Sequence, residues 1–398
     1  MILVGVDVAS EKHDVSIMRD TGEVIRDNLT IPNKESGYKK LLGEIEKAEK
    51  LYPSDKVRIG LESTGVYSMA LTDYLATRYE GSVILINPIL TSMFELSCHV
   101  HYAKTDKTDA RGICKFLSKN EDIRPYALVS YHTRQLRALY RERTKLNKRL
   151  NQDINRLKGQ LHIAFPELLG KNHATIGTFE LEFLSKYPTA DSIKDMKPEK
   201  LAAAFSKVKY MRLDVVKAGR LIESARSSVG CSALTDGFVI KETVERIKLY
   251  KKQIKELSEA MVPLVKEEYG NLLTIPGIGA VTVAGIVGEI GNVENYHGSD
   301  GIVSMAGLNP FVYESGKYVA TKTRITKKGS SYLRNALYIA AQSMYMHCVE
   351  PIYSFVNKKR KEGKRMVCAL DHAARKLCNI IFTMMKQKSD FIPPSTNS

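Results

Sequence analysis

Several features that would assign the chain to common protein classes are missing from its 398 residues. No apolar run approaches the roughly 20 residues that a membrane-spanning helix needs, and the first residues, MILVGVDVAS, contain no basic leader before an apolar stretch. The six cysteines form no C-x-x-C pair and no Cys/His cluster with zinc spacing, so we expect reduced, mostly buried thiols: Cys98, Cys114, Cys231, Cys348, Cys368 and Cys378. We therefore expect a cytoplasmic protein, bacterial or archaeal, without a membrane partner.

Acidic residues are also too few to balance the basic ones. The chain has 60 Lys and Arg against 44 Asp and Glu, which gives a formal net charge of +16. Such a charge attracts polyanions whatever the fold. Nucleic acid is the first expectation, and an anionic membrane surface is the second.

The first third of the chain has the pattern of an α/β domain. Strands are predicted at 2–8, 13–18, 23–31, 57–62 and 82–87, and helices at 34–51 and 67–78. The turn at 20–22 makes the first three strands an antiparallel meander. Three strands followed by alternating helices and strands is the order of a ribonuclease H-like fold.

The remainder reads as mainly helical. Leucines and isoleucines recur at helical spacing from Arg134 to about Phe165, and a second such pattern runs from Val244 to Leu264, so two long amphipathic helices are predicted to pair within or between chains. The outside of the first is predicted to be basic, through Arg137, Arg141, Arg143, Lys145, Lys148, Arg149, Arg156 and Lys158. Residues 331–346 and 366–386 are two further predicted helices.

Four carboxylates occupy positions that favour metal chemistry. Asp7 and Glu62 each stand at the end of a strand, and these two strands are neighbours in a ribonuclease H-like sheet. Asp106 and Asp109 are three apart at a predicted helix start, which places them on one face. Converging carboxylates repel one another unless divalent cations lie between them, and hard oxygen ligands suit Mg²⁺ or Mn²⁺. Taken singly, Asp106 or Asp109 would more often be a helix N-cap or an acid of the first helical turn.

At these residues the chain resembles the DEDD-type insertion-sequence transposases that are guided by a bridge RNA, a group that also contains the pilin-gene invertases. The resemblance rests on GVDVASEKHDV, GLESTGVY, Asn87-Pro88 and KTDKTDARGI, and continues with IPGIGAVTVAGIVGEIG, MAGLNPFVYESGK and ITKKGSSYLRNALYIAA. It implies an α/β RuvC-like nuclease domain at 1–128, a helical coiled-coil linker region at 129–267 and an α-rich C-terminal transposase domain at 268–398.

The resemblance also implies roles for individual residues. Asp7, Glu62, Asp106 and Asp109 match the metal-binding tetrad, and Ser315 matches a serine that attacks DNA, with the tetrad of a partner subunit completing the site. From the residues alone Ser315 is a turn serine with no histidine nearby as a base, and Ser330 and Ser331 are rivals. Thr326 stands where a serine is more usual in the family.

Nucleic-acid contacts are expected in the last third. Gly277 and Gly279 lie in a turn before a helix, as in a helix-hairpin-helix motif, although a plain tight turn explains them as well. Basic residues surround Ser315 in sequence and are predicted to contact the DNA backbone, unless they are a solvated loop: Lys317, Lys322, Arg324, Lys327, Lys328 and Arg334. The basic run at 358–365 fits either a solvated face or contact with DNA or RNA.

Together these features predict a transposase that is a homo-oligomer, dimer or tetramer, and that uses a structured guide RNA to align donor and target DNA. Strands would be exchanged through Ser315 with Mg²⁺, or alternatively Mn²⁺, held by the tetrad. The alternatives are a Holliday-junction-type nuclease that activates water, a site-specific DNA invertase, and a non-catalytic nucleic-acid scaffold.

Overall fold

The computed structural model describes residues 1–63, 65–98, 106–120, 122–169, 176–205, 213–231, 234–311, 314–315, 318–319 and 324–393. The chain divides into two compact units. Unit 1 comprises Met1–Ser130 together with Gly291–Gly301, and unit 2 comprises Tyr131–Ile290 together with Ile302–Ser398. Each unit is described by itself. None of the described helices is long and apolar enough to span a membrane.

Unit 1 is built on a five-stranded sheet in the order β3-β2-β1-β4-β5. The strands confirm the five predicted ones: β1 (Ile2–Val8), β2 (Lys12–Arg19), β3 (Val24–Pro32), β4 (Val57–Glu62) and β5 (Val83–Ile86). β1, β2 and β3 form the antiparallel meander, while β4 is parallel to β1 and β5 is parallel to β4. This mixed sheet is consistent with a ribonuclease H-like domain.

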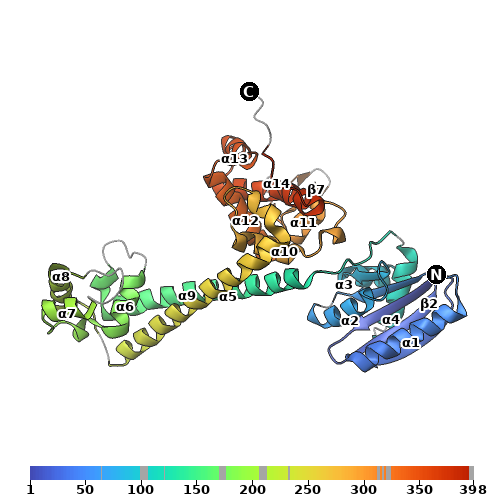
Figure 1. Ribbon diagram of the computed structural model, residues 1–398, viewed down its shortest axis with the longest axis horizontal. Helices are drawn as coiled ribbons and strands as arrows, with labels where there is room; N and C mark the ends of the chain where they lie inside the picture. Colours follow the sequence, from blue (N-terminus) through green and yellow to red (C-terminus); the bar gives the residue numbers. More distant parts are fainter. Residues whose placement is uncertain are drawn as a thin grey trace. The chain divides into compact units, whose positions relative to one another are not determined.

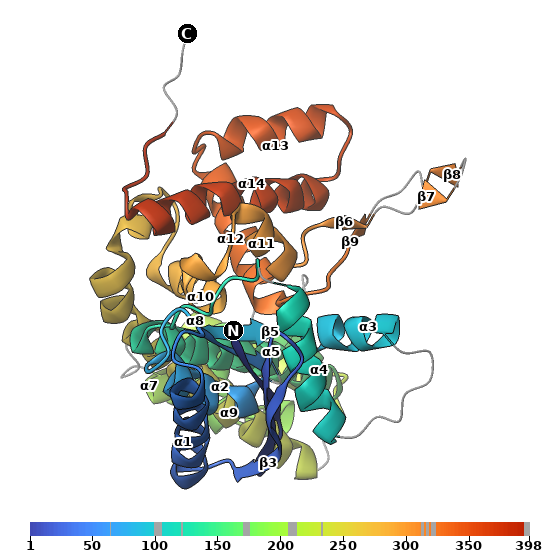
Figure 2. The ribbon, with the colours of Figure 1, turned by 90° about the vertical axis from the view of Figure 1, so that its right-hand side faces the viewer.

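Helices cover both faces of this sheet (Figure 2). On one face, α1 (Glu35–Leu51) and α2 (Val66–Ala76) pack on Val4, Val6 and other alternate strand residues. On the other face, α4 (Asp106–Lys119) packs on Leu3, with Phe94 of α3 (Pro88–Cys98) at the edge of the same cluster. Because both sheet faces are buried, β1 (ILVGVDV) reads as a nearly continuous apolar run.

Unit 2 is organised around two long helices, α5 (Tyr131–Ala164) and α9 (Leu234–Tyr269), which pack side by side within the chain (Figure 1). Small helices enclose a separate core at one end of this pair, in which Phe183 and Phe205 stack. These elements are η1 (Pro166–Leu169), α6 (Thr178–Lys186), η2 (Ala190–Ser192), α7 (Pro198–Phe205) and α8 (Val215–Arg226).

The rest of unit 2 is a second helical body. It contains η3 (Gly270–Thr274), α10 (Ala280–Ile290), α12 (Ser331–Met346), α13 (Ile352–Lys361) and α14 (Met366–Gln387). η4 (Val293–Asn295) lies in unit 1, and α11 (Ser299–Met305) begins there and ends in unit 2. Between α11 and α12 lie four two-residue strands, β6 (Pro310–Phe311), β7 (Glu314–Ser315), β8 (Tyr318–Val319) and β9 (Arg324–Ile325).

The basic outer surface predicted for α5 is wrong in part. Arg137 donates to the carbonyl oxygen of Gly288 at 2.5 Å, and Arg143 donates to Ser258 Oγ at 2.8 Å. Arg141 likewise binds a carboxylate of α10. These three arginines therefore hold neighbouring helices, because hydrogen bonds from a charged donor are stronger than those between neutral groups. Exposed cations remain at Lys145, Lys148, Arg149 and Arg156.

Candidate catalytic site

The strand register brings Asp7 and Glu62 together. Val6 of β1 pairs with Leu61 of β4 in a parallel ladder, so the next residue on each strand is Asp7 on one and Glu62 on the other. Neighbouring residues in register point to the same face of a sheet. Both carboxylates are half-buried at the carboxyl ends of their strands.

Helix α4 covers the same face at this point. Gly5 and Gly60 pair in register two residues earlier, and a Cβ on Gly5 would clash with the carbonyl oxygen of Ala110 and lie 2.9 Å from Cys114 Sγ. A Cβ on Gly60 would lie 2.8 Å from Ile113 Cγ2. The two glycines thus let α4 approach the sheet closely.

This close approach fixes where the start of α4 lies. Asp109 directly precedes Ala110, whose carbonyl oxygen contacts Gly5, so Asp109 begins the part of α4 that covers β1. Asp106 opens the helix, and its side chain lies outside the described residues. The start of α4 therefore lies on the face of the sheet that carries Asp7 and Glu62, near the carboxyl ends of β1 and β4.

The donor chemistry of this set fits a hard divalent cation. Asp7, Glu62 and Asp109 offer carboxylate oxygens alone, with no thiolate or imidazole among them, which suits Mg²⁺ or Mn²⁺ and disfavours zinc. Among the residues that the structure describes, no three of His, Cys, Asp and Glu already form a group that could hold a metal ion. That search does not include the side chain of Asp106.

Two polar neighbours of these carboxylates were missed by the sequence reasoning. Thr91 of α3, which is 2% exposed, donates its hydroxyl hydrogen to Glu62 Oε1. Asp14 of β2 is paired with Asp7 across the antiparallel ladder, is 6% exposed, and accepts a hydrogen bond of 2.5 Å from Thr30 Oγ1. The sequence could have indicated Asp14, because an acid inside an otherwise buried strand needs hydrogen bonds or a cation to offset the loss of its hydration.

Ser315 belongs to unit 2, in a group of four short strands, β6, β7, β8 and β9, which we call the arm. At its base, β6 pairs antiparallel with β9, and further along Ser315 of β7 pairs with Tyr318 of β8. Figure 2 shows β7 and β8 extending away from the helices of this unit. The side chain of Ser315 itself lies outside the described residues.

The base of the arm is fixed by backbone hydrogen bonds. Lys327 donates its amide to the Gly307 carbonyl at 3.0 Å, and Ser330 donates its amide to the Met305 carbonyl at 2.6 Å. Arg334 donates to the Ala306 carbonyl at 2.7 Å. Lys327 and Lys328 are exposed here, while Lys317, Lys322 and the side chain of Arg324 lie outside the described residues.

Ser330, one of the rival nucleophiles, has a structural role. It is the N-cap of α12 and accepts a hydrogen bond of 3.1 Å from the Leu333 amide. Its hydroxyl donates to Glu289 Oε2 at 2.7 Å. Ser331 is the first residue of α12. Because both hydrogen-bonding functions of the Ser330 hydroxyl are engaged, Ser330 is poorly suited to attack DNA.

Glu289 is a fully buried acid that joins three helices. Arg141 of α5 binds it with two hydrogen bonds of 2.6 and 2.9 Å, and Ser330 at the start of α12 supplies a third. Burial alone would raise the pKa of Glu289, but these hydrogen bonds and the charges of Arg141 and Arg137 outweigh it and lower the pKa. The charged form is therefore held beside the base of the arm.

Gly277 and Gly279 lie in the turn before α10, as predicted. Gly277 has a positive φ of 82°, which glycine adopts without strain, and its carbonyl oxygen accepts a hydrogen bond of 2.5 Å from Ser343 Oγ. A Cβ on Gly277 would lie 3.0 Å from His347 Nδ1, whereas Gly279 has open space around its Cα. Gly277 therefore packs the turn against α12, and contact with nucleic acid stays a prediction.

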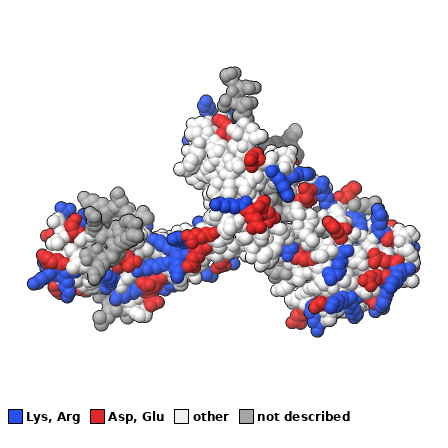
Figure 3. All heavy atoms as spheres, in the orientation of Figure 1, with Lys and Arg blue, Asp and Glu red and all other residues white. Residues whose placement is uncertain are grey.

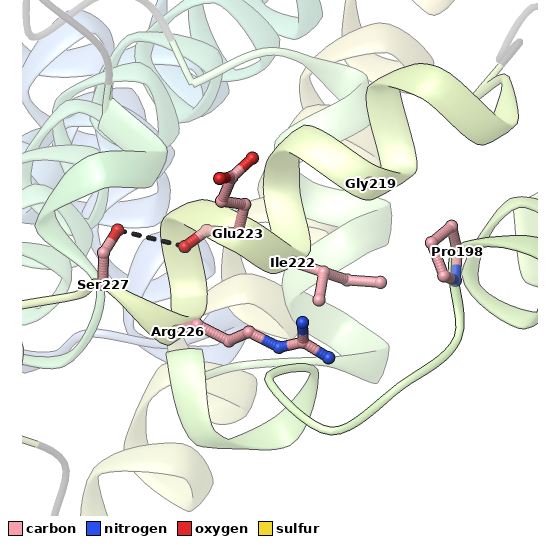
Figure 4. A pocket seen from close by; sticks show the side chains of 6 residues that line it. All are labelled: Pro198, Gly219, Ile222, Glu223, Arg226 and Ser227. Atoms are coloured by element: carbon pink, nitrogen blue, oxygen red, sulfur yellow. Dashed lines mark hydrogen bonds between the residues drawn. The ribbon is translucent and has the colours of Figure 1, made fainter.

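One pocket of about 530 Å³ lies elsewhere, between α7 and α8 (Figure 4). Pro198, Ile222 and Arg226 line it, and Arg226 is engaged by the Lys194 carbonyl at 2.8 Å. It contains none of the predicted site residues.

Two family models match the chain. One, described as "Transposase", matches residues 4–166, and one described as "Transposase IS116/IS110/IS902 family" matches residues 269–357. Together they span more than half of the chain. The first match contains the four carboxylates and the second contains Ser315.

Three relatives are similar over different lengths. The insertion element IS116 uncharacterized 44.8 kDa protein of Streptomyces clavuligerus is 24% identical over 405 residues, which cover 98% of this chain and 96% of that protein. The pilin gene-inverting protein of Moraxella bovis is 28% identical over 30% of this chain and 37% of its own. The transposase for insertion sequence element IS1328 of Yersinia enterocolitica is 32% identical over 30% of this chain and 36% of its own.

Proposed function

Since the chain belongs to the IS116/IS110/IS902 family of transposases and is a DNA-recombining enzyme, we propose that it cuts and rejoins donor and target DNA by metal-assisted transesterification at Ser315, guided by a structured bridge RNA. The observation that carries this proposal is the register that sets Asp7 beside Glu62 under the start of α4. The extended position of Ser315 on the arm supports it.

In this proposal Asp7, Glu62, Asp106 and Asp109 hold Mg²⁺ or Mn²⁺. When bound, the cations would lower the pKa of the attacking hydroxyl and offset the charge that develops on the phosphate oxygens. Thr91, through its hydrogen bond, would keep the Glu62 carboxylate oriented towards the edge of the sheet. The division into a nuclease domain (1–128), a linker (129–267) and a transposase domain (268–398) is part of the same proposal.

Ser315 would act as the nucleophile in a balanced exchange of bonds. Its Oγ loses a proton and forms a bond to the scissile phosphorus, while the bond from phosphorus to the leaving hydroxyl of the DNA strand breaks and that hydroxyl gains a proton. Attack by a hydroxyl of another strand reverses the step and releases Ser315. The number of phosphoester bonds is unchanged throughout, so no ATP is needed.

Basic groups around the arm would hold the DNA. Lys327 and Lys328 are exposed at its base, and we propose the same role for Lys317, Lys322, Arg324 and Arg334. Gly277 and Gly279 would let a phosphate approach the turn before α10.

The proposed RNA and the proposed oligomer both involve the long helices. The exposed cations of α5, Lys145, Lys148, Arg149 and Arg156, offer a surface for RNA phosphates. A dimer or tetramer would let the arm of one subunit reach the carboxylates of another.

The proposal is tested by incubating the protein with its flanking DNA, its RNA and Mg²⁺, followed by denaturation. We expect DNA covalently attached to a peptide that contains Ser315, and loss of this adduct in Ser315→Ala and Asp7→Asn. A Holliday-junction-type nuclease would instead cut DNA with Ser315→Ala, because water would be the nucleophile. Cleavage that persists with Ser315→Ala but is lost with Asp7→Asn would sink the serine mechanism.

Omitting the RNA tests separately whether RNA guides the reaction. Cleavage of the same DNA without RNA would contradict a guiding role for the RNA. A site-specific invertase is the second candidate function, favoured by the similarity to the pilin gene-inverting protein. Supplying two copies of the flanking DNA in inverted orientation distinguishes inversion from insertion.

A further inference from the structure

The last turn of α13 and the loop after it carry a dense group of cations that the proposed mechanism does not use. We call them the α13 basic surface: Lys358, Lys359, Arg360, Lys361, Lys364 and Arg365. Lys359 is half-buried, and the other five are exposed. This surface lies in the same body of unit 2 as α14 and the base of the arm.

Little negative charge opposes these cations. Glu362 is the one acid inside the run, and it forms an ion pair of 2.7 Å with Lys359. In the part of the chain that the structure describes, the other five cations form no ion pair with an acid. Elsewhere lysines are paired with acids, as in the Lys39–Glu35 pair of α1, and Figure 3 shows basic and acidic residues interspersed over the face of unit 1 that it draws.

The helix that carries most of these cations, α13, is packed against α14. Ile352 and Val356 are buried where α13 packs on α14. The ammonium groups of Lys359 and Lys376 lie 5.7 and 5.0 Å from the centroid of the Phe355 ring. Next to them is a shallow hollow of about 520 Å³ lined by Ser354, Asn357, Lys358, Lys361 and Glu362. Lys358 and Lys361 supply positive charge to this hollow and Asn357 supplies an amide, while the Glu362 carboxylate is paired with Lys359. Ammonium and amide groups are both donors that contact phosphate oxygens.

Asp371 and His372 are adjacent residues of α14, and they are near both the α13 basic surface and the base of the arm. Burial raises the pKa of Asp371, and the positive charges of His372, Arg334 and Lys327 oppose that rise. Burial and the charges of Lys359 and Lys364 lower the pKa of His372. Cations of the arm base and of the α13 basic surface therefore flank adjacent residues of one helix.

We propose that the α13 basic surface binds the phosphate backbone of duplex DNA that adjoins the segment held at the base of the arm. Duplex DNA carries one charge per roughly 1.7 Å of its axis, so the surface, at the end of a helix about 15 Å long, faces several phosphates. Continuity with Lys327 and Arg334 at the arm base favours DNA over RNA as the occupant. Lysines at a helix end position a duplex without reading its bases.

The test measures binding without cleavage, so it does not depend on the serine mechanism. Lys358→Ala/Lys361→Ala/Lys364→Ala is made in full-length Ser315→Ala protein and titrated with mixed-sequence duplex DNA in EDTA at several salt concentrations. All three side chains are exposed, so folding is unaffected. We expect affinity to fall roughly tenfold or more, and the slope of log K against log salt to decrease by about 0.9 per lost phosphate contact.

The matched control removes three exposed lysines of α1, Lys39→Ala/Lys47→Ala/Lys50→Ala, which changes the net charge equally. It should leave both affinity and slope close to those of the parent protein. Equal losses in both triple variants would overturn the proposal, because net charge alone would then explain them. Unchanged DNA binding, or a loss confined to double-stranded RNA tested in parallel, would overturn it as well.

Discussion

Asp7 lies in a row of polar side chains that crosses four neighbouring strands. Thr30 of β3 pairs with Asp14 of β2, Asp14 pairs with Asp7 of β1, and Asp7 neighbours Glu62 of β4 in the parallel ladder. Alternation puts all four on the face that α4 covers. A nearly buried Asp14 beside Asp7 adds negative charge where the proposed cations would sit, so Asp14 is a candidate positioning residue.

Replacing Asp14 with asparagine keeps its shape and removes its charge. We expect Asp14→Asn to raise the Mn²⁺ concentration for half-maximal binding by about tenfold, as other changes next to metal ligands do, with cleavage recovering at high Mg²⁺. Metal binding is measured by electron paramagnetic resonance of Mn²⁺. Asp55→Asn, at the opposite end of the sheet, is the control and should not alter it; an unchanged metal requirement in Asp14→Asn rules out this role.

Glu289 is a buried charge whose cost of burial is offset by hydrogen bonds from neighbouring helices. Its carboxylate is fully buried, and it accepts hydrogen bonds from Arg141 of α5 and from Ser330 at the start of α12. Removing one partner of such a group leaves the other inadequately compensated. Since Arg141 is 43% exposed, water offsets part of that loss.

Glu289→Gln is therefore expected to lower the free energy of unfolding by about 2 kcal/mol at pH 7. The pKa of Glu289 is lowered in the folded state, so its contribution is present above its unfolded pKa of 4.5 and is lost as pH falls through the lower folded value. Chemical denaturation from pH 7 down to pH 3 should show wild type and variant converging. A difference that stays constant with pH would contradict this account.

At the scale of elements, the fit of α4 against the sheet decides whether the carboxylates meet. Gly5 and Gly60 are paired in register directly beneath it, and both are positions where a Cβ would come within 3 Å of helix atoms. At Gly5 the nearest atom is the backbone carbonyl oxygen of Ala110, which no side-chain rotation can remove.

Gly5→Ala should consequently destabilise unit 1 by about 1–3 kcal/mol through overpacking and reduce DNA cleavage by shifting the start of α4. Gly43→Ala is the matched control: Gly43 lies inside α1 with nothing within 4 Å, so alanine there should stabilise the helix by roughly 0.5–1 kcal/mol. Thermal unfolding checks both changes, and equal effects of like sign would refute the argument.

The periodicity of apolar residues predicted most helices and strands, but it did not predict helix α3 or the short strands of the arm. β1, β4 and α12 begin and end at the predicted residues because buried alternation or helical spacing is uninterrupted there. Helix α3 was missed because Pro88 looked like a terminator, yet proline suits the first position of a helix. The arm was read as a loop, since two-residue strands leave no period to detect.

The site was only partly predictable for a related reason. The four carboxylates could be chosen from their places at strand and helix ends, but strand register, which pairs Asp7 with Asp14 and sets it beside Glu62, depends on tertiary packing. Thr91 lies on the helix that was not predicted. Ser315 carries no local signal that distinguishes it from a turn serine, and only the family resemblance identifies it.

At the scale of the whole molecule, unit 1 is not one continuous stretch of chain. Residues 291–301 return to complete it, and the Asn295 side chain accepts a hydrogen bond of 2.7 Å from the Ala127 amide and donates one of 3.0 Å to the Ala127 carbonyl. Asn292 donates to the Leu128 carbonyl at 2.8 Å. The segment at 127–128 is therefore held by hydrogen bonds to residues more than 160 positions later in the sequence.

Asn295→Ala removes both hydrogen bonds to Ala127 and should lower the stability of unit 1 by about 1–2 kcal/mol. Hydrogen exchange is the direct measurement, because the amide of Ala127 loses its acceptor and should exchange faster. Asn379→Ala, on the exposed side of α14, should leave that amide unchanged. Equal protection of Ala127 in wild type and Asn295→Ala would show that the segment is held in another way.

The returning segment bears on how such a gene can be rearranged. A chimera made by joining one protein's residues 1–130 to the remainder of a relative would inherit a carboxylate-bearing body whose fastening residues, 291–301, came from the other parent. Exchanging the gene at the codon for residue 130 would therefore combine residues 1–130 of one parent with residues 291–301 of the other within a single folded unit. Recombination that preserves function must carry both stretches together, which couples the inheritance of two separate parts of this gene.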